Sequence, residues 1–302
     1  MKFCIIVPTY NSLPTLPAAV DSALAQTFDD YVVHVSDNAS NDGSVEYLRG
    51  LDHAKLSTAL HTECVGKTAN WNRAFETAPE AEYFVMLHSD DVLYPQALSV
   101  LAAAVEREPG AVLYFTNHDA LSLDGVTVRP RRGWPLGYRI GSSRFDRLQT
   151  LLNAVTVVGT VFRAETFRKI GGFPDRFQFY QDMELYSAMV EHGDAVYFPA
   201  TIGQYRDTPL RPANLLRFAE EEILWLKERL KCWPANFRQP ILRLWAGRRS
   251  LLLSTQVPEK VDEYAQFLSL QEVTYSSRQQ SLSRLDLIHR AYKLWCSVIG
   301  RC

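Results

Sequence analysis

The sequence is poor in cysteine, and its cysteines show none of the spacings that build a structural framework. There are five, an odd number without any CxxC pair: Cys4, Cys64, Cys232, Cys296 and Cys302. Small disulfide-bonded domains pair their cysteines, and zinc sites commonly use CxxC pairs. The cysteine content therefore argues against both and favours a reducing compartment.

Long apolar runs are absent as well. No stretch approaches the run of about 18 apolar residues that predicts a membrane-spanning helix. The first apolar run, Phe3 to Val7, is ended by Pro8 too early for a signal peptide. We therefore expect a cytoplasmic protein. Peripheral attachment at the inner face of the cell membrane is the alternative that the basic C-terminal region raises.

The two common glycine-rich nucleotide-binding loops are also missing. The sequence contains no GxGxxG, which argues against a dinucleotide fold, and His61 stands where a P-loop ending in Gly66-Lys67 needs a glycine. Gly66 and Lys67 still stand just before a predicted helix, whose N-terminus favours anions. They are candidates to face a diphosphate, or else a turn glycine beside a solvated lysine.

The composition itself is that of an ordinary globular protein, with 47% hydrophobic and 22% charged residues. Charge is unevenly distributed, because residues 1–210 carry a formal charge of −8 and residues 211–302 carry +6. We expect a first domain over 1–210, with a donor half of about 1–118 and an acceptor half of about 119–210, and a basic helical extension over 211–302. The acidic first domain argues against nucleic-acid binding.

Strands and helices alternate along the first domain. Apolar, β-branched runs predict strands, and stretches with helical spacing predict the helices between them. The predicted strands are 3–7, 31–35, 56–60, 83–87, 112–116, 155–163, 197–199 and 202–206, and the predicted early helices are 13–26, 45–51 and 68–78. This order predicts an α/β fold with a mostly parallel sheet flanked by helices, in which ligands bind at the carboxyl ends of the strands. Three segments that follow strands, 8–11, 37–44 and 88–91, should then share one rim.

The stretch from Phe84 to Pro95 is the most informative part of this rim. An apolar run ends there at Asp90 and Asp91, two adjacent carboxylates that repel each other and are costly to bury. A divalent cation such as magnesium, bound through one or two carboxylates, compensates such a pair. Alternatively, the two acids cap the helix that Pro95 opens.

Four segments together resemble a known family. Residues 7–11, 36–44, 66–72 and 89–91 are similar in order and spacing to the family 2 glycosyltransferases, over about residues 3–206. The resemblance implies an inverting transferase of GT-A fold. It also implies a nucleotide-diphosphate sugar as the donor and a divalent metal, Mg²⁺ or Mn²⁺, as the cofactor.

The resemblance implies roles for residues of the donor site. The residues expected to bind the nucleotide sugar are Pro8, Thr9, Tyr10, Asn11, Asp37, Gly66, Lys67, Ser89, Asp90 and Arg206. Pro8, Thr9 and Tyr10 would line the pocket for the base and the ribose. Asp37 would accept a hydrogen bond from the base, and Arg206 would lie near the diphosphate.

The metal would be held at the acidic pair. Asp90 matches the last acid of the family's DxD motif and would be the ligand, with Asp91 as its supporting partner or as a second ligand. His88 stands where the first acid of the motif is expected. A neutral imidazole binds metals but supplies no negative charge, so the motif is degenerate. The alternative for His88 is an ordinary hydrogen bond at a strand end.

Asp182 is the candidate catalytic residue. It matches the second acid of the family's Glu-Asp pair, which acts as general base, and Gln181 replaces the first acid. Inverting transfer needs one base to take the proton of the attacking hydroxyl group. Glu184, two positions further along a helix, would point about 200° away from Asp182. A helix N-cap is the alternative role for Asp182.

Candidates for acceptor binding and membrane contact come later in the chain. Arg132 and Trp134 lie in an arginine-rich stretch, and such side chains pair with phosphate or stack on a sugar, although a solvated loop is the alternative. Helical patterns occupy about 215–230, 240–254, 259–270 and 282–299. The last of them is amphipathic and basic, so it either lies on an anionic membrane or packs against its own domain.

The sequence thus predicts a glycosyltransferase that moves a sugar from a nucleotide-diphosphate donor to a hydroxyl group of a glycan or lipid-linked acceptor, in cell-surface polysaccharide or glycolipid biosynthesis. One alternative is a non-catalytic nucleotide-sugar-binding module, which the residues at His88 and Gln181 would allow. The other is a sugar-nucleotide nucleotidyltransferase, whose glycine-rich loop after the first strand is missing.

Overall fold

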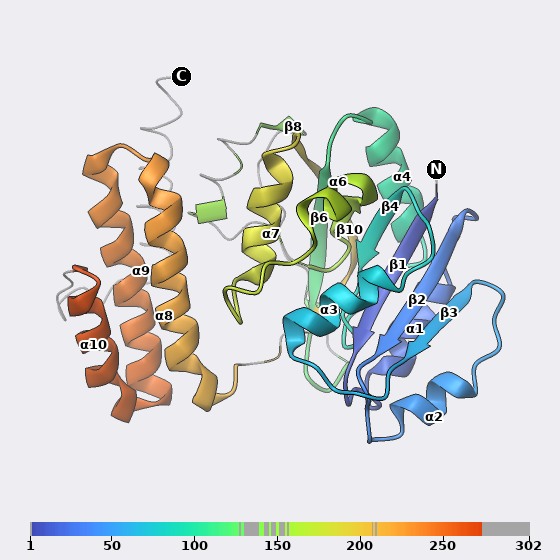
Figure 1. Cartoon of the computed structure of the whole chain (residues 1–302), viewed down its shortest axis with the longest axis horizontal. Coiled ribbons are helices and arrows are strands. Elements are labelled where there is room, and N and C mark those ends of the chain that lie inside the picture. The colour runs from blue at the N-terminus through green and yellow to red at the C-terminus, as the bar shows by residue number, and fades with distance from the viewer. Residues whose placement is uncertain are drawn as a thin grey trace. The chain divides into compact units, whose positions relative to one another are not determined.

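The computed structural model describes residues 2–126, 128–129, 139–141, 145, 149–150, 155, 157–206, 208 and 210–273 (Figure 1). The chain divides into two compact units. The described residues of the first unit lie between 2 and 208, without Thr150, and those of the second are Thr150 and 210–273. The predicted boundary after residue 210 and the donor and acceptor halves of the first domain stay predictions.

A sheet of ten described strands forms the centre of the first unit. Its strands are β1 (Phe3–Thr9), β2 (Tyr31–Asp37), β3 (Leu56–Leu60), β4 (Tyr83–Met86), β5 (Val92–Leu93), β6 (Leu113–Leu121), β7 (Val128–Arg129), β8 (Arg139–Ile140), β9 (Val161–Arg163) and β10 (Ala195–Arg206). The main path runs β3-β2-β1-β4-β9-β6-β10-β5, with β7 beside β6 and β8 beside β10. The pairs among β1 to β4 and the pair β6–β10 are parallel, whereas β5, β7, β8 and β9 pair antiparallel. The parallel ladders hold most of the paired residues, so the prediction of a mostly parallel sheet is confirmed.

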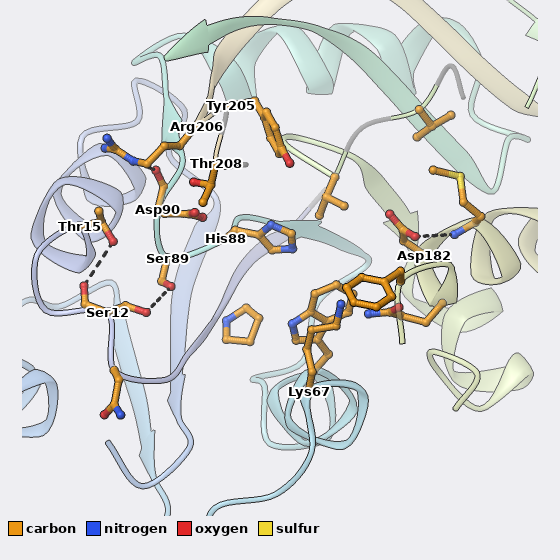
Figure 2. A pocket seen from close by; sticks show the side chains of 18 of the residues that line it. Ser12, Thr15, Lys67, His88, Ser89, Asp90, Asp182, Tyr205, Arg206 and Thr208 are labelled. Atoms are coloured by element: carbon orange, nitrogen blue, oxygen red, sulfur yellow. Dashed lines mark hydrogen bonds between the residues drawn. The ribbon is translucent and has the colours of Figure 1, made fainter. Parts of the chain in front are cut away.

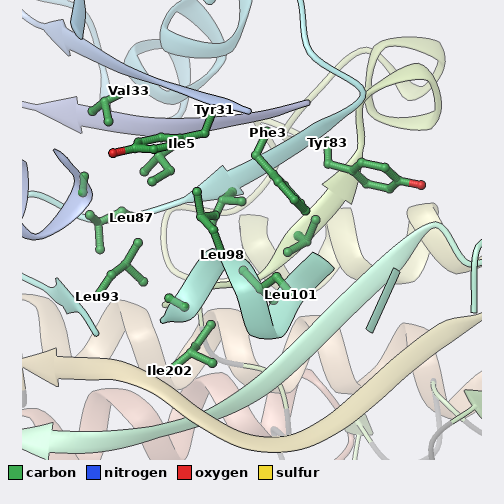
Figure 3. Close-up of a cluster of buried hydrophobic side chains, with 14 of the residues drawn as sticks. Phe3, Ile5, Tyr31, Val33, Tyr83, Leu87, Leu93, Leu98, Leu101 and Ile202 are labelled. Atoms are coloured by element: carbon green, nitrogen blue, oxygen red, sulfur yellow. The ribbon is translucent and has the colours of Figure 1, made fainter. Parts of the chain in front are cut away.

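Helices cover both faces of this sheet. They are α1 (Leu16–Leu24), α2 (Ser44–Arg49), α3 (Lys67–Glu76), α4 (Ala97–Arg107), α6 (Ala164–Ile170) and α7 (Gln181–Val190). On one face Phe3 and Ile5 of β1 join a buried cluster that includes Leu98 and Leu101 of α4 (Figure 3). On the other face Phe84 of β4 contacts aromatic rings from α3 and α6. Burial on both faces explains why the strand sequences are apolar without alternation.

Two strand predictions differ from the structure, and one short strand was not predicted. The predicted strand 155–163 begins only at Val161, because Val157 and Val158 are buried within a loop and burial alone gave them a strand-like pattern. The predicted strands 197–199 and 202–206 form one strand, β10, whose register against β6 shifts twice. The two-residue strand β5 has no periodicity that a sequence could reveal.

The second unit is helical over its described part. It contains α8 (Pro212–Arg229), α9 (Ala235–Gln256) and α10 (Val261–Leu270), with short 3₁₀ turns at Leu230–Cys232 and Pro258–Lys260. The predicted stripe on the first of these helices is buried as expected: Leu215, Ala219, Ile223, Leu226 and Leu230. Among the residues that the structure describes, no helix combines the length and apolar character needed to span a membrane. The predicted amphipathic helix 282–299 lies outside the described residues.

Candidate active site

The ends of β1, β2 and β4 meet at one rim, as predicted. Parallel pairing sets Thr9 beside Asp37 at the ends of β1 and β2. Ser40 links the loops that follow, because its backbone N–H donates to Asp37 Oδ1 at 2.8 Å and its Oγ accepts from the Asn11 backbone N–H at 2.8 Å. Sequence segments that are far apart therefore share one wall of polar groups.

A pocket of about 680 Å³ opens at this rim (Figure 2). The predicted site residues that line it are Pro8, Asn11, Lys67, His88, Ser89, Asp90, Asp182 and Arg206. Those that do not line it are Thr9, Tyr10, Asp37, Gly66 and Asp91. Arg132 and Trp134 lie outside the described residues. Asp90 and Asp182 thus reach the same pocket from distant parts of the sequence.

The acidic turn after β4 contains three groups of metal-ligand type. Ligand atoms of His88, Asp90 and Asp91 all lie within 4.8 Å of one another, and His88 Nδ1 is 3.8 Å from Asp91 Oδ2. Burial lowers the pKa of His88 to about 4, so its imidazole is neutral at neutral pH. Burial and the charge of Asp90 raise the pKa of Asp91 well above its usual range.

The acidic turn contains buried polar atoms that suit a divalent cation. Within the described part of the chain, His88 Nε2 and Asp91 Oδ2 are buried and have no hydrogen-bond partner. Unpaired buried groups of this kind are costly, and a cation beside Asp90 would compensate them. One imidazole nitrogen and two carboxylates also suit Mn²⁺ or Mg²⁺ as a donor set.

Asp91 is also a structural anchor. It is 1% exposed, and its Oδ1 accepts a hydrogen bond of 2.8 Å from the backbone N–H of Arg206. The Arg206 guanidinium donates from Nε to the Asp90 carbonyl and from Nη1 to the carbonyls of Ser122 and Leu123. Two of its three nitrogens are therefore already bonded to backbone oxygens. Arg206 fastens the end of β10 to the acidic turn, which the sequence alone did not predict.

Helix α3 contributes a cation and an aromatic ring to the pocket. Lys67 and Trp71 are one turn apart and line the pocket together, with Lys67 Nζ 5.0 Å from the centre of the Trp71 ring. Trp71 packs on the His88 imidazole, with ring centres 5.2 Å apart and planes inclined by 32°. Sequence reasoning missed Trp71, although its spacing of four from Lys67 on a predicted helix would have suggested it.

Asp182 lies in the first turn of α7, whose N-cap is Tyr180. The N-cap alternative is therefore wrong. Oδ1 of Asp182 accepts a hydrogen bond of 2.9 Å from the backbone N–H of Met183. Burial raises the pKa of Asp182 above its usual value, and Lys67 opposes part of that rise. Glu184 does not line the pocket and lies 3.8 Å from Arg176, in agreement with the expectation that the two acids point apart.

Of the residues predicted to bind the base and the ribose, Pro8 lines the pocket, whereas Thr9, Tyr10 and Asp37 do not. Tyr10 is 48% exposed, whereas Asp37 is fully buried. Asp37 Oδ2 is buried and has no hydrogen-bond partner among the described residues. The neighbouring Asn38 side chain accepts from Arg73 and donates to the Val65 carbonyl at 2.9 Å. This bond to Arg73 was not predicted.

The chain is similar in sequence to known glycosyltransferases and polysaccharide synthases. The chain is 22% identical over 189 residues to chondroitin synthase of Pasteurella multocida (strain Pm70), a match that covers 63% of this chain and 19% of that protein. The chain spans less than a third of the length of this and of another curated relative that it matches.

Solved structures share the fold. S. aureus TarS 1–349 in complex with UDP superposes with a TM-score of 0.65 and 19% identity, over 97% of this chain and 87% of that one. Mannosyltransferase PcManGT from Pyrobaculum calidifontis in complex with GDP-Man and Mn²⁺ gives a TM-score of 0.58 and 20% identity, over 97% and 80%. These likenesses confirm the predicted GT-A fold.

The sequence profile described as "Glycosyl transferase family 2" matches residues 4–171, which is more than half of the chain. This span includes β1 to β4 and the acidic turn that follows them. The predicted enzyme class, a glycosyltransferase, is therefore confirmed. The chain belongs to glycosyl transferase family 2.

Proposed function

We propose that the protein transfers a sugar from a nucleotide-diphosphate sugar to a hydroxyl group of an acceptor, with inversion at the anomeric carbon. The observation that carries this proposal is the shared pocket of Asp90 and Asp182, which sets an acidic turn suited to a metal opposite an isolated carboxylate. In Figure 2 the His88 ring lies between these two acids. A donor diphosphate at one side and an acceptor hydroxyl at the other fit this separation of roles.

Asp90 would hold the divalent metal, Mg²⁺ or Mn²⁺, with His88 and Asp91 completing the protein's share of its ligands. When bound, the metal would neutralise the negative charge that develops on the leaving diphosphate. The neutral state of His88 supports this assignment, because only an unprotonated imidazole binds a metal. The Mn²⁺ found with PcManGT supports it by analogy of fold.

Asp182 would be the general base. Inversion requires a single displacement, in which the acceptor oxygen attacks the anomeric carbon and a base takes its proton. A carboxyl whose pKa is raised by burial is a better proton acceptor than a solvated one. The positive charge of Lys67 nearby opposes part of this rise in the pKa of Asp182.

The remaining predicted roles follow from the same arrangement. Thr9, Tyr10 and Asp37 would receive the base and ribose beside the pocket, with Asp37 Oδ2 as the acceptor for the base. Lys67 would face the diphosphate. The complexes of related folds with UDP and GDP-Man support a nucleotide-sugar donor, although the nucleotide differs between them.

The acceptor would be a glycan or a lipid-linked sugar in cell-surface polysaccharide or glycolipid biosynthesis. The similarity to a chondroitin synthase supports a polysaccharide product. Arg132 and Trp134 remain the proposed acceptor contacts. Peripheral contact of the basic C-terminal region with an anionic membrane, on the cytoplasmic side, remains part of the proposal.

A non-catalytic nucleotide-sugar-binding module is the second candidate, because His88 and Gln181 replace two acids of the family pattern. An assay of transfer or hydrolysis of radiolabelled UDP-, GDP-, dTDP- and CDP-sugars with Mn²⁺ distinguishes a transferase from a binding module. The proposed function expects turnover with one nucleotide and its loss in Asp182→Asn. Donor binding without turnover in the wild type would favour the binding module.

A further inference from the structure

One polar side chain of the pocket has no role in the chemistry proposed above. Gln181 is the first residue of α7, next to Asp182, and it lines the pocket although only 1% of its surface is exposed. Among the described residues, neither its side-chain nitrogen Nε2 nor its oxygen Oε1 has a hydrogen-bond partner. A buried amide left unpaired destabilises the protein. A partner is therefore expected to come from whatever occupies the pocket.

A second buried glutamine in this fold has a side-chain amide that is hydrogen-bonded at both ends. Gln26 is also largely buried, and its Nε2 donates to the carbonyls of Ser22 at 2.9 Å and Tyr94 at 3.0 Å. Its Oε1 accepts from the backbone N–H of Leu98 at 3.0 Å. Both ends of that side chain are satisfied by the protein. The contrast with Gln181 indicates that the two glutamines serve different purposes.

The chemistry of an amide narrows the identity of the missing partner. Its nitrogen donates and its oxygen accepts, so a single group that pairs with both must also accept and donate. A hydroxyl group does so. A phosphate only accepts and would leave Oε1 unpaired, and an ammonium only donates and would leave Nε2 unpaired.

The surroundings of Gln181 point to a sugar as the carrier of that hydroxyl group. Phe179 lines the same pocket and is only partly buried, so it offers an apolar surface to a sugar ring. Gln181 and Asp182 are adjacent in the first turn of α7, and both line the pocket. Its hydroxyl partner therefore belongs to the molecule on which Asp182 would act.

We infer that Gln181 is a specificity-determining residue that hydrogen-bonds a hydroxyl group of the acceptor sugar adjacent to the one that Asp182 deprotonates. This inference rests on the proposed function, because it takes Asp182 as the base. It assigns the acceptor to polyhydroxylated compounds with two neighbouring hydroxyl groups. Glutamate, the residue of the family pattern at this position, would lack the donor and would add a second negative charge beside Asp182.

The first test measures thermal stability without any ligand. Gln181→Met replaces the amide by an apolar chain of similar length, so its Tm should equal or exceed that of the wild type. Gln26→Met is the matched control and should lower the Tm by about 2–4 °C or more, because it breaks bonds that the protein itself makes. A fall in Gln181→Met as large as that in Gln26→Met would show a structural role and overturn the inference.

The second test measures sugar binding by saturation-transfer NMR. The probes are the methyl pyranosides of glucose, galactose, mannose and N-acetylglucosamine. The wild type should transfer saturation to at least one of them. Gln181→Met should weaken that binding by about 10–10²-fold, because the hydroxyl group of the sugar is then buried without a partner. Gln181→Glu should weaken it as well, since it lacks the donor.

Equal saturation transfer in the wild type and Gln181→Met, or none in the wild type, would overturn the inference. Asp182→Asn separates this outcome from a failure of the proposed function. It should keep the saturation transfer while losing sugar transfer from the nucleotide donor. A protein that binds the pyranoside through Gln181 but never transfers a sugar would refute the proposed function and leave the binding role of Gln181 standing.

Discussion

The backbone N–H of Arg206 donates a hydrogen bond of 2.8 Å to Oδ1 of Asp91. This bond joins the end of β10 to the acidic turn after β4, two segments that are far apart in the sequence. Asp90, the preceding residue, lines the pocket instead and contacts Arg206 through its backbone carbonyl. Two adjacent acids therefore have different surroundings, and substitutions at them should have different effects.

Asp91→Ala should destabilise the fold by about 1–3 kcal/mol, because the buried N–H of Arg206 loses its acceptor. Asp91→Asn keeps an oxygen at that position and should cost much less. Urea unfolding of both variants measures the difference. Equal free energies of unfolding for Asp91→Ala and the wild type would contradict the anchoring role.

Asp182→Asn should lower kcat by about 10²–10⁴-fold, the range of a general base, while leaving nucleotide binding intact. Burial raises the pKa of the Asp182 carboxyl, so activity should rise with pH through that raised value as the base loses its proton. The same shift means that the folded state holds this proton more tightly than the unfolded chain. The carboxyl therefore lowers stability as pH rises through that window.

The pH profile of turnover for the wild type and Asp182→Asn tests this assignment. The variant should show low activity without the acidic limb. Full activity in the variant, or an unchanged acidic limb in its residual activity, would assign the base to another group.

The sequence predicted that the strand ends meet at one rim, because this feature depends on local patterns. The apolar runs before Asp37 and Asp90 are buried parallel strands, and parallel strands bring their carboxyl ends to one rim. Asp182 was predicted by its match to a family pattern and by the opposite direction of Glu184. The shared rim needed only periodicity and spacing, whereas the role of Asp182 came from the resemblance to the family.

Other features depend on packing between distant segments and could not be predicted. The bonds of Arg206 to Asp91 and Ser122 arise because β10 runs between β6 and β5, an order that no local pattern encodes. The unpaired amide of Gln181 is visible only when its neighbours are placed. The substitution of glutamine for an acid was evident in the sequence, but its burial was not.

A turn behind the site offers a matched pair of glycine substitutions. Gly171 and Gly172 both have positive φ, at 89° and 85°. A Cβ at Gly172 would lie 2.5 Å from Asn72 Oδ1, whereas a Cβ at Gly171 would meet nothing within 4 Å. Asn72, on the helix that carries Lys67, accepts from the Phe173 N–H at 2.7 Å and donates to its carbonyl at 2.9 Å.

Gly171→Ala should therefore cost about 1–2 kcal/mol of stability, the strain of a left-handed residue. Gly172→Ala carries the same strain and also displaces Asn72, so it should cost at least about 1 kcal/mol more. Chemical denaturation of the two variants gives the comparison. Equal losses of stability in the two variants would show that the position of Asn72 does not depend on Gly172.

His34 should make the fold sensitive to acid. It is 1% exposed, and its ring nitrogens contact Ser57 Oγ at 3.1 Å and Thr77 Oγ1 at 3.0 Å. Burial, with a smaller contribution from His61, lowers the pKa of His34 from 6.5 to about 4. Between these values the unfolded chain binds the proton and the folded chain does not. Stability is therefore fully present above the unfolded pKa and is lost as pH falls towards 4.

Between pH 7 and about 4.5, the free energy of unfolding should fall by about 2–3 kcal/mol less in His34→Gln than in the wild type. This difference does not depend on the effect of the substitution at pH 7. Guanidinium unfolding of both proteins at several pH values measures this slope. The same slope in variant and wild type would mean that other groups cause the acid sensitivity.

The central claim is that the acidic turn holds a metal on a nucleoside diphosphate. The most direct measurement is the thermal shift given by UDP, GDP, dTDP and CDP, with and without Mn²⁺, in the wild type and in Asp90→Asn. A ligand that binds only the folded state raises the Tm by mass action. We expect a Mn²⁺-dependent shift of the Tm with at least one nucleotide in the wild type and the loss of this shift in Asp90→Asn. No shift with any nucleotide, or the same shift in Asp90→Asn, would contradict it.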